Sequence, residues 1–79
     1  MVKIRFHPSF KKELKKTDKQ IRIKILKQIE KISQNPEIGK PMKYTRKGTR
    51  ELYIQPYRLS YIYEDNIIKI ISLYHKDKQ

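Results

Sequence analysis

The chain has no cysteine and only two glycines among its 79 residues. Without cysteine there is neither a disulfide framework nor a thiolate metal site, and cysteine usage leaves the redox compartment undetermined. Two histidines make a poor metal set, so we predict no metal and no cofactor. Long hydrophobic runs are missing as well, and charges interrupt the apolar residues of the N-terminus, unlike a signal peptide or a membrane span. We expect a cytoplasmic protein that does not bind membranes.

Acidic residues are scarce: 8 Asp and Glu face 20 Lys and Arg, and the net charge is +12 at pH 7. In so small a chain this excess favours a polyanionic partner, which means nucleic acid first and an acidic protein second. The length is enough for one domain with one modest core and too short for two. We therefore treat residues 1–79 as a single domain.

The first half of the chain predicts a strand and two helices. Val2, Ile4 and Phe6 alternate with charged residues, which is the period of a strand with one buried face. Pro8 suits the first position of a helix that ends near Thr17. His7, just before this proline, is expected to shape the junction between strand and helix.

A second helix is expected from its N-cap, Asp18, to the Asn35-Pro36 pair, which stops it. One side of this helix is apolar and the other is rich in lysine. The apolar stripe consists of Ile21, Ile25, Ile29 and Ile32, with Leu26 beside it.

The second half predicts a loop and three strands. Residues 36–48 hold most of the breakers in the sequence and read as the loop. Strands are expected around Leu52 and Ile54, over 57–63, and over 67–74 after a turn at 64–66. Together these elements predict an α+β fold: an N-terminal strand and a two-helix hairpin packed on one face of a small, mainly antiparallel four-stranded sheet. The other face of the sheet is then available for chemistry.

Four short motifs occur in order along this pattern: Gly39-Lys40-Pro41-Met42-Lys43, Arg50-Glu51-Leu52, Tyr57-Arg58-Leu59 and the late His75. With the element order, they resemble the RelE/ParE toxin superfamily over nearly the whole chain. The resemblance implies a toxin of a type II toxin–antitoxin module, silenced by a cognate acidic antitoxin in a toxin–antitoxin heterotetramer. RelE-like toxins cut mRNA in the ribosomal A site, whereas ParE-like toxins poison DNA gyrase on the same fold.

The resemblance also implies roles for single residues in metal-free RNA cleavage. Arg58 occupies the position of a phosphate-contacting arginine, and its planar fork suits nonbridging oxygens. His75 is the expected proton donor to the leaving group, with Lys76 as the alternate acid. Glu51 acts either as a general base or as a group that orients Arg50 or Arg58. The expected RNA-binding residues are basic or aromatic: Lys40, Lys43, Arg46, Lys47, Tyr53, Tyr74 and Lys78.

The sequence departs from the ribonuclease pattern in two places. Glu51 and Tyr53 replace the lysine pair that some RelE-like enzymes carry on this strand. The terminal tyrosine and extra helix that some relatives use to stack on the substrate base are missing, so Tyr74 or Tyr53 would have to supply that surface.

Each assignment has a plainer alternative. Arg58 also reads as a strand arginine paired with Glu51 or Glu64, and His75 as part of a solvated tail. The lysines between positions 11 and 31 read first as a solvated helix face. Three functions therefore stay open: a ribosome-dependent mRNA endonuclease, a gyrase inhibitor without nuclease activity, and a degenerate module that only binds RNA or its antitoxin.

Overall fold

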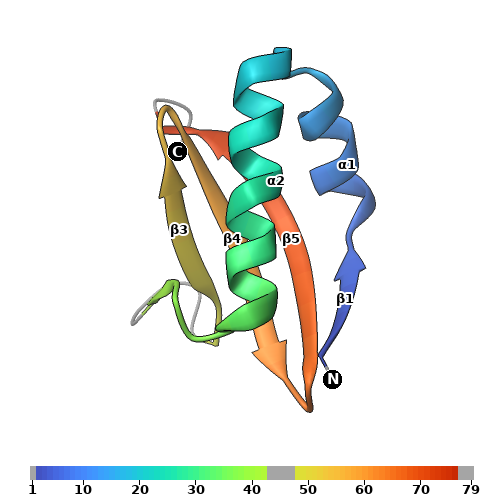
Figure 1. The fold of residues 1–79 in the computed structure, drawn as a ribbon, viewed down its shortest axis with the longest axis vertical. Helices are drawn as coiled ribbons and strands as arrows, with labels where there is room; N and C mark the ends of the chain where they lie inside the picture. The colour runs from blue at the N-terminus through green and yellow to red at the C-terminus, as the bar shows by residue number, and fades with distance from the viewer. Residues whose placement is uncertain (1, 43–47, 77–79) are drawn as a thin grey trace.

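The computed structural model describes residues 2–42 and 48–76, and in them a two-helix layer covers one face of a five-stranded sheet (Figure 1). The elements are, in chain order, β1 (Lys3–Phe6), α1 (Pro8–Lys15), α2 (Lys19–Gln34), β2 (Lys40–Pro41), β3 (Arg50–Ile54), β4 (Tyr57–Glu64) and β5 (Ile67–His75). The strand order across the sheet is β1-β5-β4-β3-β2. β1 runs parallel to β5, and the other neighbours are antiparallel. The α+β architecture expected from the sequence is confirmed.

The strand count is a correction, because the sequence predicted four strands and the described residues form five. The additional strand, β2, lies in the segment expected to be a loop and pairs Lys40 with Glu51 and Pro41 with Arg50. Two residues are too few to show an alternating pattern, and proline is tolerated here because β2 is an edge strand. Beyond it, the Met42 N–H donates to the Thr49 carbonyl at 3.0 Å.

Both helices begin where the sequence predicted. The Ser9 N–H donates to Nδ1 of His7 at 3.1 Å, so His7 caps α1 and Pro8 occupies its first turn. The Ile21 N–H donates to Oδ1 of Asp18 at 2.9 Å, which caps α2. These side chains satisfy backbone donors that have no partner within the helix. None of the described helices is both long and apolar enough to cross a membrane.

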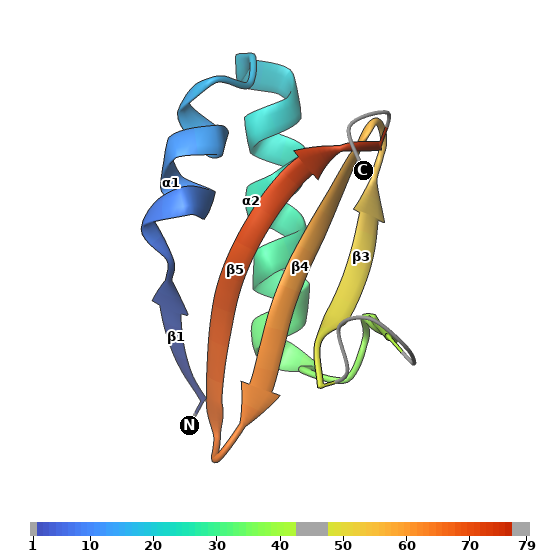
Figure 2. The ribbon, with the colours of Figure 1, turned by 180° about the vertical axis from the view of Figure 1, so that it is seen from behind.

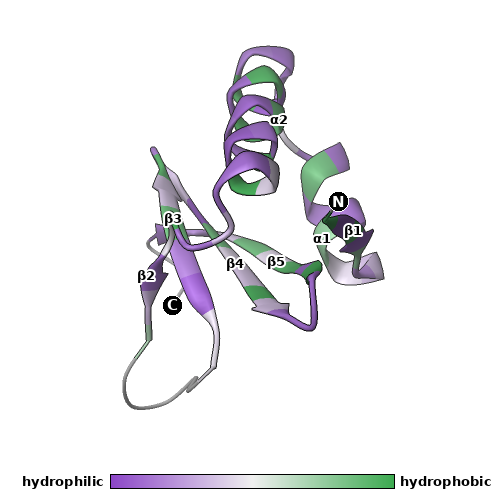
Figure 3. Ribbon diagram, turned by 60° about the horizontal axis from the view of Figure 1, so that its bottom comes forward, coloured by the Kyte–Doolittle hydropathy of each residue, from purple (hydrophilic) through white to green (hydrophobic). Residues whose placement is uncertain are grey.

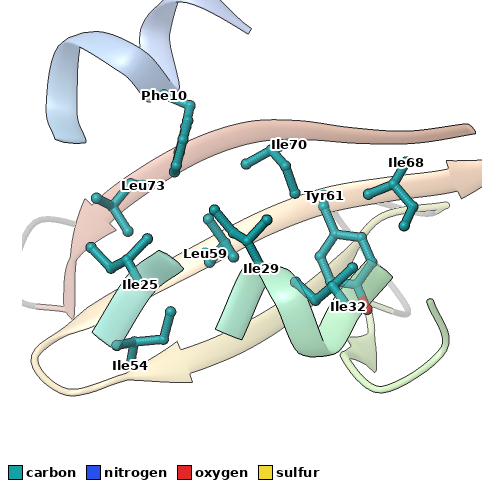
Figure 4. Packing of buried hydrophobic residues seen from close by; sticks show 10 residues of the cluster. All are labelled: Phe10, Ile25, Ile29, Ile32, Ile54, Leu59, Tyr61, Ile68, Ile70 and Leu73. Carbon is teal, nitrogen blue, oxygen red and sulfur yellow. The ribbon is translucent and has the colours of Figure 1, made fainter. Parts of the chain in front are cut away.

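The core lies between the helices and the sheet (Figure 4). Three isoleucines of α2 and one phenylalanine of α1 meet apolar side chains from β3, β4 and β5. Figure 3 shows α2 lying on one side of the sheet that contains these strands. The buried apolar residues are Phe10, Ile25, Ile29, Ile32, Ile54, Leu59, Tyr61, Ile68, Ile70 and Leu73.

Two apolar residues expected to be buried are exposed. Leu26, beside the buried stripe of α2, is 49% exposed. Phe6 is 40% exposed and stacks on Phe10 with ring centroids 5.7 Å apart. The alternation in β1 is real, but β1 is an edge strand, so its apolar side is only partly covered.

Two-residue turns set the register of the antiparallel strands. Between β3 and β4 the turn consists of Gln55 and Pro56, joined by a cis peptide bond. Between β4 and β5, Asp65 and Asn66 have φ of 54° and 64°, the left-handed pair that a type I′ hairpin turn requires. A bulge between Ser60 and Tyr61 shifts the β4–β5 register. Seen from behind, β4 and β5 lie in front of α2, and α1 lies to the side of β5; we call this side of the sheet the open face (Figure 2).

Candidate functional site

Strand pairing determines which side chains share the open face. Tyr53 on β3 pairs with Arg58 on β4, and Arg58 pairs with Tyr74 on β5. Directly paired residues of antiparallel strands point to the same side of the sheet. Leu59 and Tyr61 alternate with Arg58 and are buried under the helices, so Arg58 and its two partners lie on the open face.

Glu51, Arg58 and Tyr74 form a hydrogen-bonded cluster that joins three strands. Nη1 of Arg58 donates to Oε1 of Glu51 at 3.5 Å, and the Tyr74 hydroxyl donates to Oε2 of Glu51 in a short hydrogen bond. Only 9% of the Glu51 surface is exposed. A carboxylate this buried needs such partners, because burying an unpaired charge is costly. We call these three residues the Glu51 cluster.

The Arg58 guanidinium keeps unused hydrogen-bonding capacity. Its Nε is buried and has no hydrogen-bond partner among the described residues. A buried donor without a partner costs about 1–3 kcal/mol. The guanidinium carbon lies 6.0 Å from the centre of the Tyr53 ring, at the limit of a cation–π contact. The Arg58 side chain as a whole is 38% exposed, so other parts of it stay open to an anionic partner.

A pocket of about 630 Å³ opens beside this cluster. It extends from β2 across β3 to β4. It therefore combines Lys40, at the edge of the sheet, with the aromatic and charged side chains of β3 and β4 on the open face. Its lining residues are Lys40, Pro41, Met42, Glu51, Leu52, Tyr53 and Arg58. A concave surface with converging polar groups is where a ligand site is expected first.

Arg50 lies away from this pocket. It pairs with the buried Tyr61, and its Nη1 donates to the carbonyls of Glu37 and Gly39 at 3.1 and 2.9 Å. Arg50 therefore ties the segment before β2 to the sheet, and the structure does not bring it to the Glu51 cluster.

Tyr61 supports the same segment from below. Its hydroxyl accepts from the Gly39 N–H at 2.8 Å and donates to the Pro36 carbonyl at 2.8 Å. Burial raises the pKa of Tyr61 above its ordinary value of 10.0, although the Gly39 hydrogen bond and the charge of Arg50 oppose that rise. No pattern in the sequence indicates this role, because Tyr61 occupies one more apolar position of a strand.

His75 also lies apart from Arg58. It pairs with Tyr57, and the two rings meet edge to face with centroids 5.5 Å apart. Both belong to the helix side of the sheet, in a pocket of about 440 Å³ that includes Glu13 of α1 and Lys16, the C-cap of that helix. The neighbouring Lys76 is exposed, and its N–H donates to the Pro56 carbonyl at 2.9 Å. The other expected basic contacts, Lys43, Arg46, Lys47 and Lys78, lie outside the described residues.

Comparisons with known proteins identify the family of this domain. Residues 4–79 match the family described as ParE toxin of type II toxin–antitoxin system, parDE, so the chain belongs to this family, within the RelE/ParE toxin superfamily. It is a toxin of a type II toxin–antitoxin system. No curated protein matches the sequence.

Solved structures share the fold. The YoeB dimer from Staphylococcus aureus is 32% identical, with a TM-score of 0.75, and the match covers 94% of this chain and 97% of that one. The YoeB–YefM heterotetramer from the same organism is 33% identical, with a TM-score of 0.72 and coverage of 95% and 98%. The RelBE2 toxin–antitoxin complex from Mycobacterium tuberculosis is 24% identical, with a TM-score of 0.83 and coverage of 94% and 96%, which supports the fold alone.

Proposed function

We propose that this toxin is a ribosome-dependent mRNA endonuclease that acts in the cytoplasm. The observation that carries the proposal is Arg58, whose side chain lines an open pocket and is 38% exposed. The pocket wall adds Lys40, which suits phosphate, and Tyr53, which is 52% exposed and suits a base.

The proposed reaction needs no external reactant. The 2′-oxygen of one nucleotide gives its proton to water and attacks the adjacent phosphorus, the bond from phosphorus to the 5′-oxygen breaks, and the 5′-oxygen takes up a proton, so the reaction consumes no net proton. A 2′,3′-cyclic phosphate and a 5′-hydroxyl result. Arg58 stabilises the extra negative charge that the nonbridging oxygens carry in the transition state.

The proposed acid, His75, lies on the helix side of the sheet at the end of β5, with Lys76 next to it. For either to protonate the 5′-oxygen, the RNA has to pass around the end of β5 where Tyr57 and His75 pair. His75→Ala therefore tests whether the chain end takes part in the chemistry.

The antitoxin is the proposed partner in the resting state. The S. aureus relative is a heterotetramer with its antitoxin, and we propose the same kind of assembly here. With a net charge of +12, this toxin would attract an acidic antitoxin electrostatically.

Primer extension on an mRNA held in translating ribosomes tests the nuclease. We expect cuts at the A-site codon with the wild-type toxin, and a loss of at least about a hundredfold in Arg58→Ala, the usual cost of removing a charge-stabilising donor. Arg58→Lys keeps the charge but loses the fork, so its activity should also fall sharply. Arg5→Ala, which removes an equal charge from the exposed side of β1, is the matched control and should cut normally.

The second candidate is a gyrase inhibitor without nuclease activity, favoured by the ParE description of the matching family and by Glu51 at the site. It predicts intact mRNA in the same assay and accumulated cleavage complexes when purified gyrase and DNA are supplied. Cuts that persist unchanged in Arg58→Ala would refute the assigned site.

A further inference from the structure

We infer that Glu51 is a positioning residue: it holds Arg58 and Tyr74 in place for a ribonucleotide phosphate and takes no proton from the substrate. This inference rests on the proposed function and settles, for this chain, which of two roles the carboxylate has. A general base and a positioning group make different demands on geometry, and the Glu51 cluster meets only the second.

A general base has to place one oxygen within about 2.6–3.2 Å of the hydroxyl that it deprotonates. Both oxygens of Glu51 are already in use, Oε1 with Arg58 and Oε2 with Tyr74. The residue is only 9% exposed. Little of the carboxylate is therefore left for a 2′-hydroxyl, and displacing Arg58 to reach it would remove the phosphate contact that the reaction needs.

The positioning role follows from how the cluster is built. Each member comes from a different strand, β3, β4 or β5, so the sheet fixes the spacing between them. The hydrogen bond from the Tyr74 hydroxyl to Glu51 orients the phenol ring on the open face. The 3.5 Å contact with Arg58 is long for a charged pair, so it anchors one end of the guanidinium and leaves the rest of the fork for an anion.

Because Glu51 is charged, its positioning role predicts opposite changes in RNA affinity and in cutting rate when the charge is removed. A buried carboxylate near the site opposes the binding of a phosphate, so removing its charge should tighten RNA binding about two- to fivefold at low salt. The same change loosens Arg58 and Tyr74, so the cutting rate at saturating RNA should fall about tenfold. A residue that only stabilises the fold would not move these two quantities in opposite directions.

The test variant is Glu51→Gln, which keeps the size of the side chain and removes its charge. The matched control is Glu30→Gln on the exposed side of α2, which changes the net charge equally. Far-UV circular dichroism and thermal melting confirm that both variants are folded. Binding is measured by fluorescence anisotropy with a single-stranded oligoribonucleotide whose 2′-hydroxyl is replaced by hydrogen at the cut position, and cutting is measured on translating ribosomes.

A further readout does not depend on nuclease activity. The Arg58 Nε–H is buried, so its NMR signal should be protected from exchange with water, and Arg58→Lys assigns it by removing it. We expect Glu51→Gln to shift or broaden this signal and Glu30→Gln to leave it unchanged. Tyr74→Phe should perturb the same signal, because it releases one side of the carboxylate that anchors Arg58.

The outcomes of these experiments distinguish a positioning role of Glu51 from a general-base role. Tighter RNA binding with slower cutting, a changed Arg58 signal and an unaltered acid limb in the pH–rate profile of Glu51→Gln support the positioning role. A thousandfold loss of cutting with disappearance of that acid limb overturns it, because this is the behaviour of a general base. An unchanged Arg58 signal with unchanged RNA affinity also overturns it. If the wild-type toxin cuts no mRNA, the proposed function fails, while the binding and NMR results still decide the role of Glu51.

Discussion

The Tyr61 hydroxyl is a single group whose removal should loosen the wall of the site from beneath. Tyr61→Phe deletes the acceptor of the Gly39 N–H and the donor to the Pro36 carbonyl, both bonds being 2.8 Å long, and keeps the buried ring. Each lost hydrogen bond contributes about 0.5–1.5 kcal/mol, and a buried group left without a partner adds to the cost. We expect the free energy of unfolding to fall by about 2–3 kcal/mol at pH 7.

Urea unfolding followed by far-UV circular dichroism measures this loss. With an m-value of about 1 kcal/mol per molar urea for so small a domain, the midpoint should drop by about 2–3 M. Phe10→Leu, which alters the core elsewhere without deleting a hydrogen bond, is a suitable comparison. A loss below about 0.5 kcal/mol in Tyr61→Phe would refute the reasoning, since it would mean that solvent replaces both bonds at no cost.

The pH dependence of the same comparison provides an independent check. Burial raises the pKa of Tyr61 above 10.0, so the folded state holds the phenol proton more tightly than the unfolded state. The advantage of wild type over Tyr61→Phe should therefore be complete below pH 10 and should shrink as the pH rises above 10. An advantage that grows above pH 10 would contradict the assigned cause, and the difference between the two proteins cancels the titration of the lysines.

Two further predictions concern local packing and capping. Gly39→Ala should destabilise the fold by about 1–3 kcal/mol, the usual cost of overpacking, because a Cβ at this position would lie 2.6 Å from the Tyr61 oxygen and 2.7 Å from a ring carbon; thermal melting measures the loss, and an unchanged midpoint would contradict the contact. Asp18→Ala should cost about 1 kcal/mol, because it removes the cap on the Ile21 N–H, whereas Asp18→Asn should retain most of the stability; equal losses in the two variants would point to the charge instead of the cap.

Local sequence signals predicted the helices well, since each rests on chemistry within one turn. His7 with Pro8 marks the start of α1, Asp18 starts α2, and Asn35-Pro36 ends it. The three long strands followed from alternation and from the two turns between them. The short strand β2 did not, because only its partner β3 holds it in the sheet.

The candidate site was predicted only in part, because the face of the sheet on which a side chain lies depends on the register of the strand pairs. The sequence indicated Arg58 as a phosphate contact or as the partner of Glu51, and the structure shows that pair together with Tyr74. The roles of Pro41 and Met42 as walls of the pocket depend on β2 and carried no signal of their own.

The hairpin between β3 and β4 determines on which face of the sheet Arg50 and Arg58 lie. Both are strand arginines in a basic chain, and the sequence marks both as candidates for the site. The two-residue turn at Gln55-Pro56 pairs Ile54 with Tyr57, and from this pair each step back along β3 is matched by one step forward along β4. Arg58 therefore meets Tyr53 on the open face, while Arg50 meets Tyr61 on the helix side.

A slip of one residue in this register would turn the side chains of one strand to the opposite face relative to the other, burying Arg58 and exposing Leu59. The apolar side chains that pack under α2 forbid that slip, so the same contacts that form the core also place Arg58, and only Arg58 of these two, beside Glu51.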